Sequence, residues 1–132
     1  MGNINVAIVG SRNVTDQEHV HTALDKAQRQ LGFEMDDVST IITGDAKGVD
    51  HIAVQIANEN DIQTTVHEAN WEEFGRSAGP QRNRLIVEDA DIVIAIQKDN
   101  SDGTQNTIDI ANKTSDVEVF VYKIGESLLS FS

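Results

Sequence analysis

The chain has 132 residues, 39% of them hydrophobic, and no cysteine. This size suffices for one domain, residues 1–132, with a single core, while the lack of cysteine excludes disulfides and thiolate metal sites and fits a reducing cytoplasm. The 22 acidic residues against 10 basic ones give a formal net charge of −12, which disfavours nucleic-acid binding and suits a halophilic source.

Short apolar runs alternate with segments of helical spacing along the chain. Strands are predicted at residues 4–9, 40–43, 62–66, 92–96 and 117–122. The first helix is predicted to start at the capping box 15–18 and to end at Gly32. Further helices are predicted at residues 49–57, 80–90 (with Pro80 first and Leu85 on the buried side) and 103–113, with a loop at 70–79 and a tail at about 123–132.

This alternation predicts an α/β fold: a single doubly wound Rossmann-like domain with helices on both faces of a five-stranded, mainly parallel sheet. The expected strand order is 3-2-1-4-5, which puts the switch point between the first and fourth strands. The N-terminus enters a strand without a basic flank or a long apolar segment. We therefore expect no signal peptide, no membrane span and a cytoplasmic location.

Glycine turns follow three of the predicted strands, and such turns meet at one edge of a parallel sheet, where helix N-termini hold anions. They are Gly10-Ser11-Arg12, the stretch from Gly44 to Asp50, and Ser101-Asp102-Gly103-Thr104. The last is the best phosphate cradle because it joins small residues and hydroxyls to a helix start. For the first turn, a purely structural role also stays open, in which Gly10 permits the φ angle and Ser11 caps locally.

Four of the five arginines, Arg12, Arg76, Arg82 and Arg84, lie in or beside the loops at this edge. Clustered guanidinium groups in an acidic chain favour recognition of an anion, although pairing with surface carboxylates is the alternative. The segment from Ala78 to Arg84, which contains Gly79, Arg82 and Asn83, is either part of this site or an exposed polar helix start.

Asp45 is predicted to cap the second helix, and Asp50 one turn inside it either meets a ribose hydroxyl or a transferred proton, or is simply an acid near a helix N-terminus. Trp71 either stacks on a base or seals the edge of the core, and Phe74 is interpreted as structural. The four histidines, His19, His21, His51 and His67, lack ligand spacing, so no metal site is expected.

Together, AIVGSR, ITGDAKGVDHIA, the segment from Trp71 to Asn83 and S-x-GT resemble the SLOG superfamily, in its YspA-like branch. The superfamily has a Rossmann-like fold and includes the LOG nucleoside 5′-monophosphate phosphoribohydrolases and the DNA-processing protein DprA. The resemblance implies a nucleotide-derived ligand, a homodimer, and ligand contacts at Gly10, Ser11, Arg12, Gly44, Asp50, Arg82, Asn83, Ser101, Gly103 and Thr104. Trp71 and Gly79 complete the candidate set.

Two departures from that pattern bear on function. The hydrolases carry PGGxGTxxE, whose glutamate takes part in cleavage, whereas residues 101–107 here have no charge at the glutamate position, and Asp45 replaces a common glycine. The favoured function is therefore binding or sensing of a mononucleotide or an ADP-ribose-like ligand, with no cofactor. The alternatives are a phosphoribohydrolase-like N-glycosidase using Asp50, whose catalytic residues are otherwise unknown, and a protein-interaction scaffold.

Overall fold

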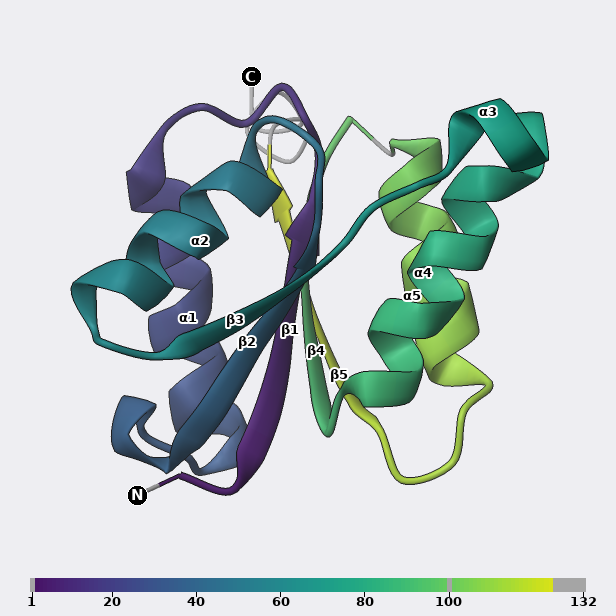
Figure 1. Ribbon diagram of the computed structural model, residues 1–132. Helices are drawn as coiled ribbons and strands as arrows, with labels where there is room; N and C mark the ends of the chain where they lie inside the picture. The colour runs from purple at the N-terminus through teal and green to yellow at the C-terminus, as the bar shows by residue number, and fades with distance from the viewer. Residues whose placement is uncertain (1, 100, 125–132) are drawn as a thin grey trace.

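A computed structural model describes residues 2–99 and 101–124 and shows a parallel sheet between two layers of helices (Figure 1). The 5-stranded sheet has the order β3-β2-β1-β4-β5, which confirms the predicted order. Its strands are β1 (Ile4–Gly10), β2 (Val38–Gly44), β3 (Gln63–His67), β4 (Ile92–Lys98) and β5 (Glu118–Ile124). The strand order reverses beside β1, which pairs with β2 on one side and with β4 on the other.

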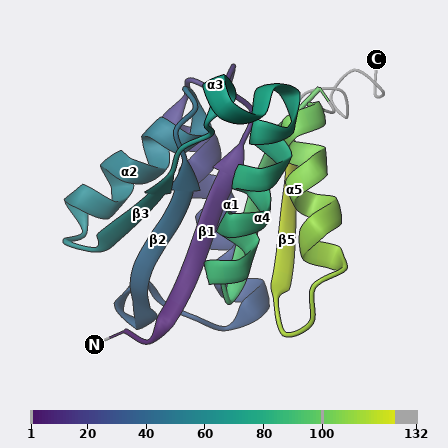
Figure 2. The same ribbon diagram turned by 45° about the vertical axis from the view of Figure 1, so that its right-hand side comes forward.

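Helices α1 (Gln17–Leu31) and α2 (Val49–Glu59) cover one face of the sheet, and α4 (Ala78–Asp89) and α5 (Asp102–Asn112) cover the other (Figures 1 and 2). The short helices η1 (Met35–Asp37), α3 (Trp71–Phe74) and η2 (Gly75–Ser77) lie in connections between these elements. The architecture is thus the predicted doubly wound α/β fold of Rossmann type.

Burial on both faces explains the continuous apolar strands. In β4, Ile92, Ile94 and Ile96 pack with the α1 and α2 side, whereas Val93 and Ala95 pack with α4 and α5. A strand covered on both faces needs apolar side chains at consecutive positions. Edge strand β3 has no fully buried residue, in agreement with its more polar sequence.

The helix starts differ from the predictions. Asp16, not Thr15, is the N-cap of α1, because its Oδ1 accepts a 2.9 Å hydrogen bond from the amide of Glu18. The end of α1 at Gly32 is confirmed, with a left-handed φ of 75° at that residue. Asp45 does not cap α2: the N-cap is Gly48, at φ 74°, so Asp50 is the second residue of the helix and lies in its first turn.

The predicted loop at 70–79 is wrong, since this segment forms α3 and η2. The Asn70 side chain caps α3 by accepting a 3.1 Å hydrogen bond from the amide of Glu73. Helix α4 starts at Ala78, two residues before Pro80. Its buried side is formed by Asn83, Ile86 and Val87, so the prediction of Leu85 on the buried side is wrong, and Leu85 is 47% exposed.

The last strand extends beyond its prediction. Lys123 and Ile124 continue β5 because they pair with Gln97 and Lys98 of β4. The predicted tail at 123–132 is therefore wrong for its first two residues, and residues 125–132 lie outside the described part of the chain. In the described residues, no helix combines the length and the apolar character that a membrane crossing needs.

Candidate functional site

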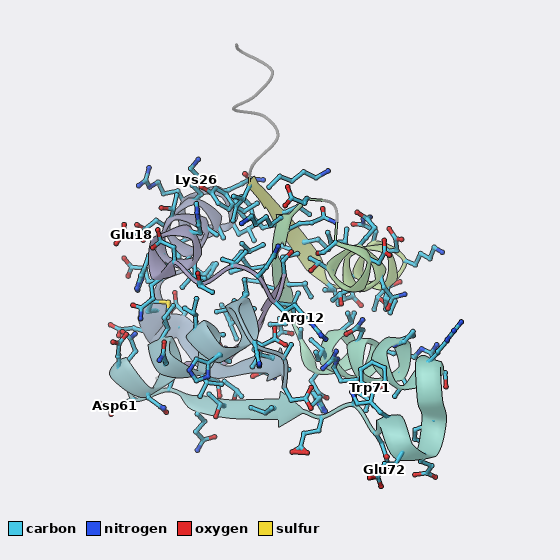
Figure 3. All side chains as sticks on the ribbon, turned by 90° about the horizontal axis from the view of Figure 1, so that it is seen from above. Arg12, Glu18, Lys26, Asp61, Trp71 and Glu72 are labelled. Atoms are coloured by element: carbon cyan, nitrogen blue, oxygen red, sulfur yellow. The ribbon has the colours of Figure 1, made fainter. Side chains whose placement is uncertain are left out.

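A cleft of about 320 Å³ opens where β1 and β4 end, at the predicted switch point. Figure 3 looks down on this edge of the molecule and shows Arg12 between the helical layers. The cleft is lined by parts of both layers: Val9, Gly10, Ser11, Arg12, Ala46, Asp50, Arg82, Asn83, Ile86, Ser101, Gly103, Thr104 and Thr107. Segments far apart in the sequence thus meet here, because the turns after β1, β2 and β4 lie at the carboxyl edge of the parallel sheet and α4 lies beside them.

Most of the predicted site residues line this cleft, and three do not. Gly44 does not line the cleft but lies next to two lining residues: an added Cβ would come within 2.6 Å of Asp50 Oδ2 and 2.7 Å of Arg82 Nη1. Trp71 is 52% exposed, and its ring lies over Gly79, whose added Cβ would be 3.3 Å from the ring. Trp71 and Gly79 therefore contact each other outside the cleft lining.

The arginines separate into two groups. Arg12 and Arg82 line the cleft, whereas Arg84 lies in a groove on the outer side of α4 together with Pro80 and Leu85. Arg76 is exposed on η2. The sequence predicted four arginines at this edge of the sheet, but of these only Arg12 and Arg82 line the candidate site.

Two glycines of the site have different physical roles. An added Cβ on Gly10 would overlap the carbonyl oxygen of Ile96 and lie 2.6 Å from Cγ2 of Val49, so this position is needed for close packing of β1, β4 and α2. Its φ is not positive, so the predicted role in permitting an unusual φ is wrong. At Gly103, by contrast, an added Cβ would meet nothing within 4 Å, and the backbone there is open to close approach.

Ser11 holds together the turns that follow β1 and β4. Its Oγ accepts a 2.8 Å hydrogen bond from the amide of Lys98 and lies 2.8 Å from Oγ of Ser101. Ser101 is the N-cap residue of α5, but its side chain makes no capping hydrogen bond. The first amides of a helix have no acceptor within the helix, so the start of α5, with Gly103 and Thr104 in the cleft lining, offers donors there.

Arg82 is held by two side chains at the wall of the cleft. Its Nη1 donates to Oδ1 of Asp45 at 2.7 Å, and its Nε donates to Oδ1 of Asn83 at 2.9 Å. Only 12% of the Arg82 side chain is exposed, against 37% of that of Asp45. The Arg82 guanidinium is therefore held in one orientation without a ligand, and its charge is paired with that of Asp45.

Asn83 joins the two helices of that layer. Its Nδ2 donates to Oδ1 of Asn106 at 3.0 Å and to the carbonyl oxygen of Gly103 at 3.4 Å, while its Oδ1 serves Arg82. Asn83 is buried, with 7% of its surface exposed. It therefore positions Arg82 relative to the start of α5.

Asp50 is the buried carboxylate of the cleft, with 5% of its surface exposed. Burial raises the pKa of Asp50 from 3.8 to about 6, although the hydrogen bond from the Ala46 amide and the charge of Arg82 both lower it. The Ala46 amide donates to Oδ2 at 3.2 Å. A carboxyl group with such a pKa holds or releases a proton near neutral pH, which suits either acid–base work or hydrogen bonding to a hydroxyl.

The histidines do not gather in the structure. His67 Nε2 lies 2.6 Å from Oδ2 of Asp89, and His51 lies 3.4 Å from the Gln55 side chain on the same helix. Among residues 2–99 and 101–124, no three His, Asp or Glu side chains are arranged to hold a metal ion.

Sequence reasoning missed several residues of the site. The Asp45–Arg82 pair joins positions far apart in the chain, and buried Gln97 supports the start of α5 by donating to the Ser101 carbonyl oxygen at 3.2 Å. Thr107 lines the cleft and donates to the carbonyl oxygen of Gly103 at 3.3 Å. Two of these residues had a signal in the sequence: Thr107 matches the missing glutamate of the hydrolase motif, and Asp45 replaces a common glycine of the family.

Comparison with known proteins identifies the family of the chain. Residues 4–74, from β1 through α3 and more than half of the chain, match the profile of the YspA, cpYpsA-related SLOG family. No curated protein and no solved structure matches the sequence. The match includes the turns at Gly10 and Gly44, while α4 and α5 complete the same cleft from outside the matched segment. The chain therefore belongs to the YspA, cpYpsA-related SLOG family, with the Rossmann-like fold that its sheet displays.

Proposed function

We propose that the protein binds or senses a nucleotide or nucleotide-derived ligand, such as a mononucleotide or an ADP-ribose-like compound, in the cleft between β1 and β4. The observation that carries the proposal is the combination, in one cleft, of a helix start without a side-chain cap, an exposed arginine and a buried carboxylate. Phosphate and sugar groups need complementary groups of these kinds. Membership of the SLOG family supports a nucleotide-related role.

The phosphate and the ribose of the ligand each have a candidate partner. Phosphate oxygens would accept hydrogen bonds from the backbone at Gly103 and Thr104, where no side chain obstructs the approach at Gly103. Arg12, on the turn after β1, adds a positive charge to the cleft lining, and among the described residues it forms no ion pair. Asp50 would accept a hydrogen bond from a ribose hydroxyl.

An N-glycosidase acting on a nucleoside 5′-monophosphate is the second candidate, and the environment of Asp50 favours it. A buried carboxyl group with a pKa of about 6 is suited to general acid catalysis near neutral pH. In this reaction the N-glycosidic bond breaks, water adds to the sugar carbon, and the base leaves with a proton. Thr107 stands where the hydrolases have their glutamate, so Asp50 would have to act in its place.

Calorimetric titration and thermal melting with adenosine 5′-monophosphate, adenosine 5′-diphosphate, ADP-ribose and NAD test the proposal, with chromatography to detect released base. Binding without base release supports a sensor, and base release that disappears in Asp50→Asn supports the glycosidase. Arg12→Gln should weaken binding by about tenfold, since it removes a charge contact to phosphate. Its matched control is Arg84→Gln, which removes the same charge from the outer groove of α4.

Two results would count against this function. If no compound of the panel binds, the scaffold alternative gains support. If Arg84→Gln weakens binding as much as Arg12→Gln does, the charge of the whole protein is responsible and the cleft is not the site.

A further inference from the structure

The ion pair of Asp45 and Arg82 has one fixed and one movable partner. Arg82 extends from α4 into the wall of the cleft, where only 12% of its side chain is exposed and Asn83 holds its Nε. Asp45 lies on the turn after β2, and 37% of its side chain is exposed. Asp45 can therefore turn toward water, whereas Arg82 stays at the cleft.

Asp45 contributes to the fold mainly through this pair. It does not cap α2, whose N-cap is Gly48. Among the residues that the structure describes, Arg82 is the hydrogen-bond partner of its side chain. A nearly buried guanidinium is costly without a counter-ion, so Asp45 stabilises the ligand-free protein by supplying a negative charge.

A second carboxylate lies close to the same guanidinium. Oδ2 of Asp50 and Nη1 of Arg82 approach the same point beside Gly44, at 2.6 Å and 2.7 Å from the position of an added Cβ. An anion that enters the cleft thus meets two carboxylates around one guanidinium. A phosphate oxygen that approaches Nη1 therefore competes with the Asp45 carboxylate for its donors and meets the negative charge of both carboxylates.

We infer that Asp45 is a built-in competitor for the anionic group of the ligand: its carboxylate occupies Nη1 of Arg82 and neutralises the guanidinium, and an anion gains that donor only by displacing Asp45. This inference rests on the proposed function, because it concerns the same cleft. Asp45 lowers the affinity of the cleft for phosphorylated ligands and leaves its affinity for uncharged nucleosides unchanged. The residue thereby sets how strongly the site discriminates between ligands by charge.

Titration with inorganic phosphate tests the competition without assuming a nucleotide. The Nε–Hε resonance of Arg82, assigned through its loss in Arg82→Lys, reports on the guanidinium in ¹⁵N-labelled protein. In Asp45→Asn it should respond at roughly tenfold lower phosphate concentration than in the wild type. Asp45→Ser repeats the test in case the asparagine variant folds poorly.

Asp25→Asn is the matched control, because it removes the same charge from an exposed position of α1 that does not line the cleft. It should change the phosphate response by less than about threefold, as a change in the general field alone would. An equal response of Asp45→Asn and the wild type, or an equal gain in Asp25→Asn, would overturn the role of Asp45.

A second titration, with adenosine 5′-monophosphate and adenosine, separates this inference from the proposed function. Asp45→Asn should bind the monophosphate about tenfold more tightly and adenosine no more tightly than the wild type does. If the monophosphate binds both proteins equally, the inference is wrong and nucleotide binding stands. If neither compound binds but phosphate shows the expected response, nucleotide binding fails and the role of Asp45 stands.

Discussion

Replacing Asp50 by asparagine should stabilise the protein at neutral pH and have little effect in acid. Asp50 is buried, and burial is the largest cause that raises its pKa from 3.8 to about 6. The folded state therefore binds the proton more tightly than the unfolded chain does. The contribution of this group is fully favourable below pH 3.8 and is lost as the pH rises through about 6.

The magnitude follows from the shift in pKa. At 1.36 kcal/mol per pKa unit, the shift from 3.8 to about 6 means that ionised Asp50 costs about 3 kcal/mol at pH 7. An asparagine has no charge to bury, so its advantage over aspartate should grow from about 0.5 kcal/mol at pH 4 to about 3 kcal/mol at pH 7. Altered hydrogen bonds, such as that from the Ala46 amide, add an offset that does not depend on pH.

Urea unfolding followed by circular dichroism, at half-unit steps from pH 4 to pH 7, measures this difference in the free energy of unfolding. Asp25→Asn is the control, since it removes an exposed aspartate in the middle of α1, and it should stay within about 0.5 kcal/mol of the wild type. The decisive quantity is the change of the gap with pH. Parallel stability curves for Asp50→Asn and the wild type would refute the reasoning, because they would mean that Asp50 titrates alike in the folded and unfolded states.

Three further predictions concern packing and hydrogen bonding. In the same urea assay, Gly10→Ala should lower the free energy of unfolding by about 1 to 3 kcal/mol, because the new Cβ would overlap neighbouring atoms. Gly103→Ala has open space at the new Cβ, so it should be neutral or raise the free energy of unfolding by up to about 1 kcal/mol. Ser11→Ala should cost about 1 to 3 kcal/mol, since it leaves a backbone amide without its acceptor, and a smaller loss in thermal melting would show that water replaces the hydroxyl. Ile86→Ala should cost about 2 to 5 kcal/mol and Leu85→Ala less than about 1 kcal/mol, because Ile86 is 0% and Leu85 47% exposed; equal losses in urea unfolding would contradict the described orientation of α4.

Local patterns were enough to predict the architecture. Continuous apolar runs such as Ile92 to Ile96 predicted strands covered on both faces, and the alternation with helical segments predicted a parallel sheet. The order 3-2-1-4-5 was expected as a usual order of this fold type, and the pairing of β1 with β2 and β4 confirms it. The end of α1 at Gly32 was also predictable, because a left-handed cap is a property of a few adjacent residues. The choice of cap was not, since Thr15 and Asp16 are both good N-caps and their backbone angles decide between them.

The sequence by itself thus determined the strands, the parallel sheet and the edge of the sheet at which the glycine turns meet, because periodicity and turn chemistry depend on neighbouring residues. Only the tertiary structure decided which side chains meet there. Asp45 pairs with Arg82 because packing of the whole domain brings α4 and the turn after β2 together. Trp71 packs on Gly79 outside the cleft lining. The pKa of Asp50 likewise depends on burial by residues from several elements, and no local pattern records it.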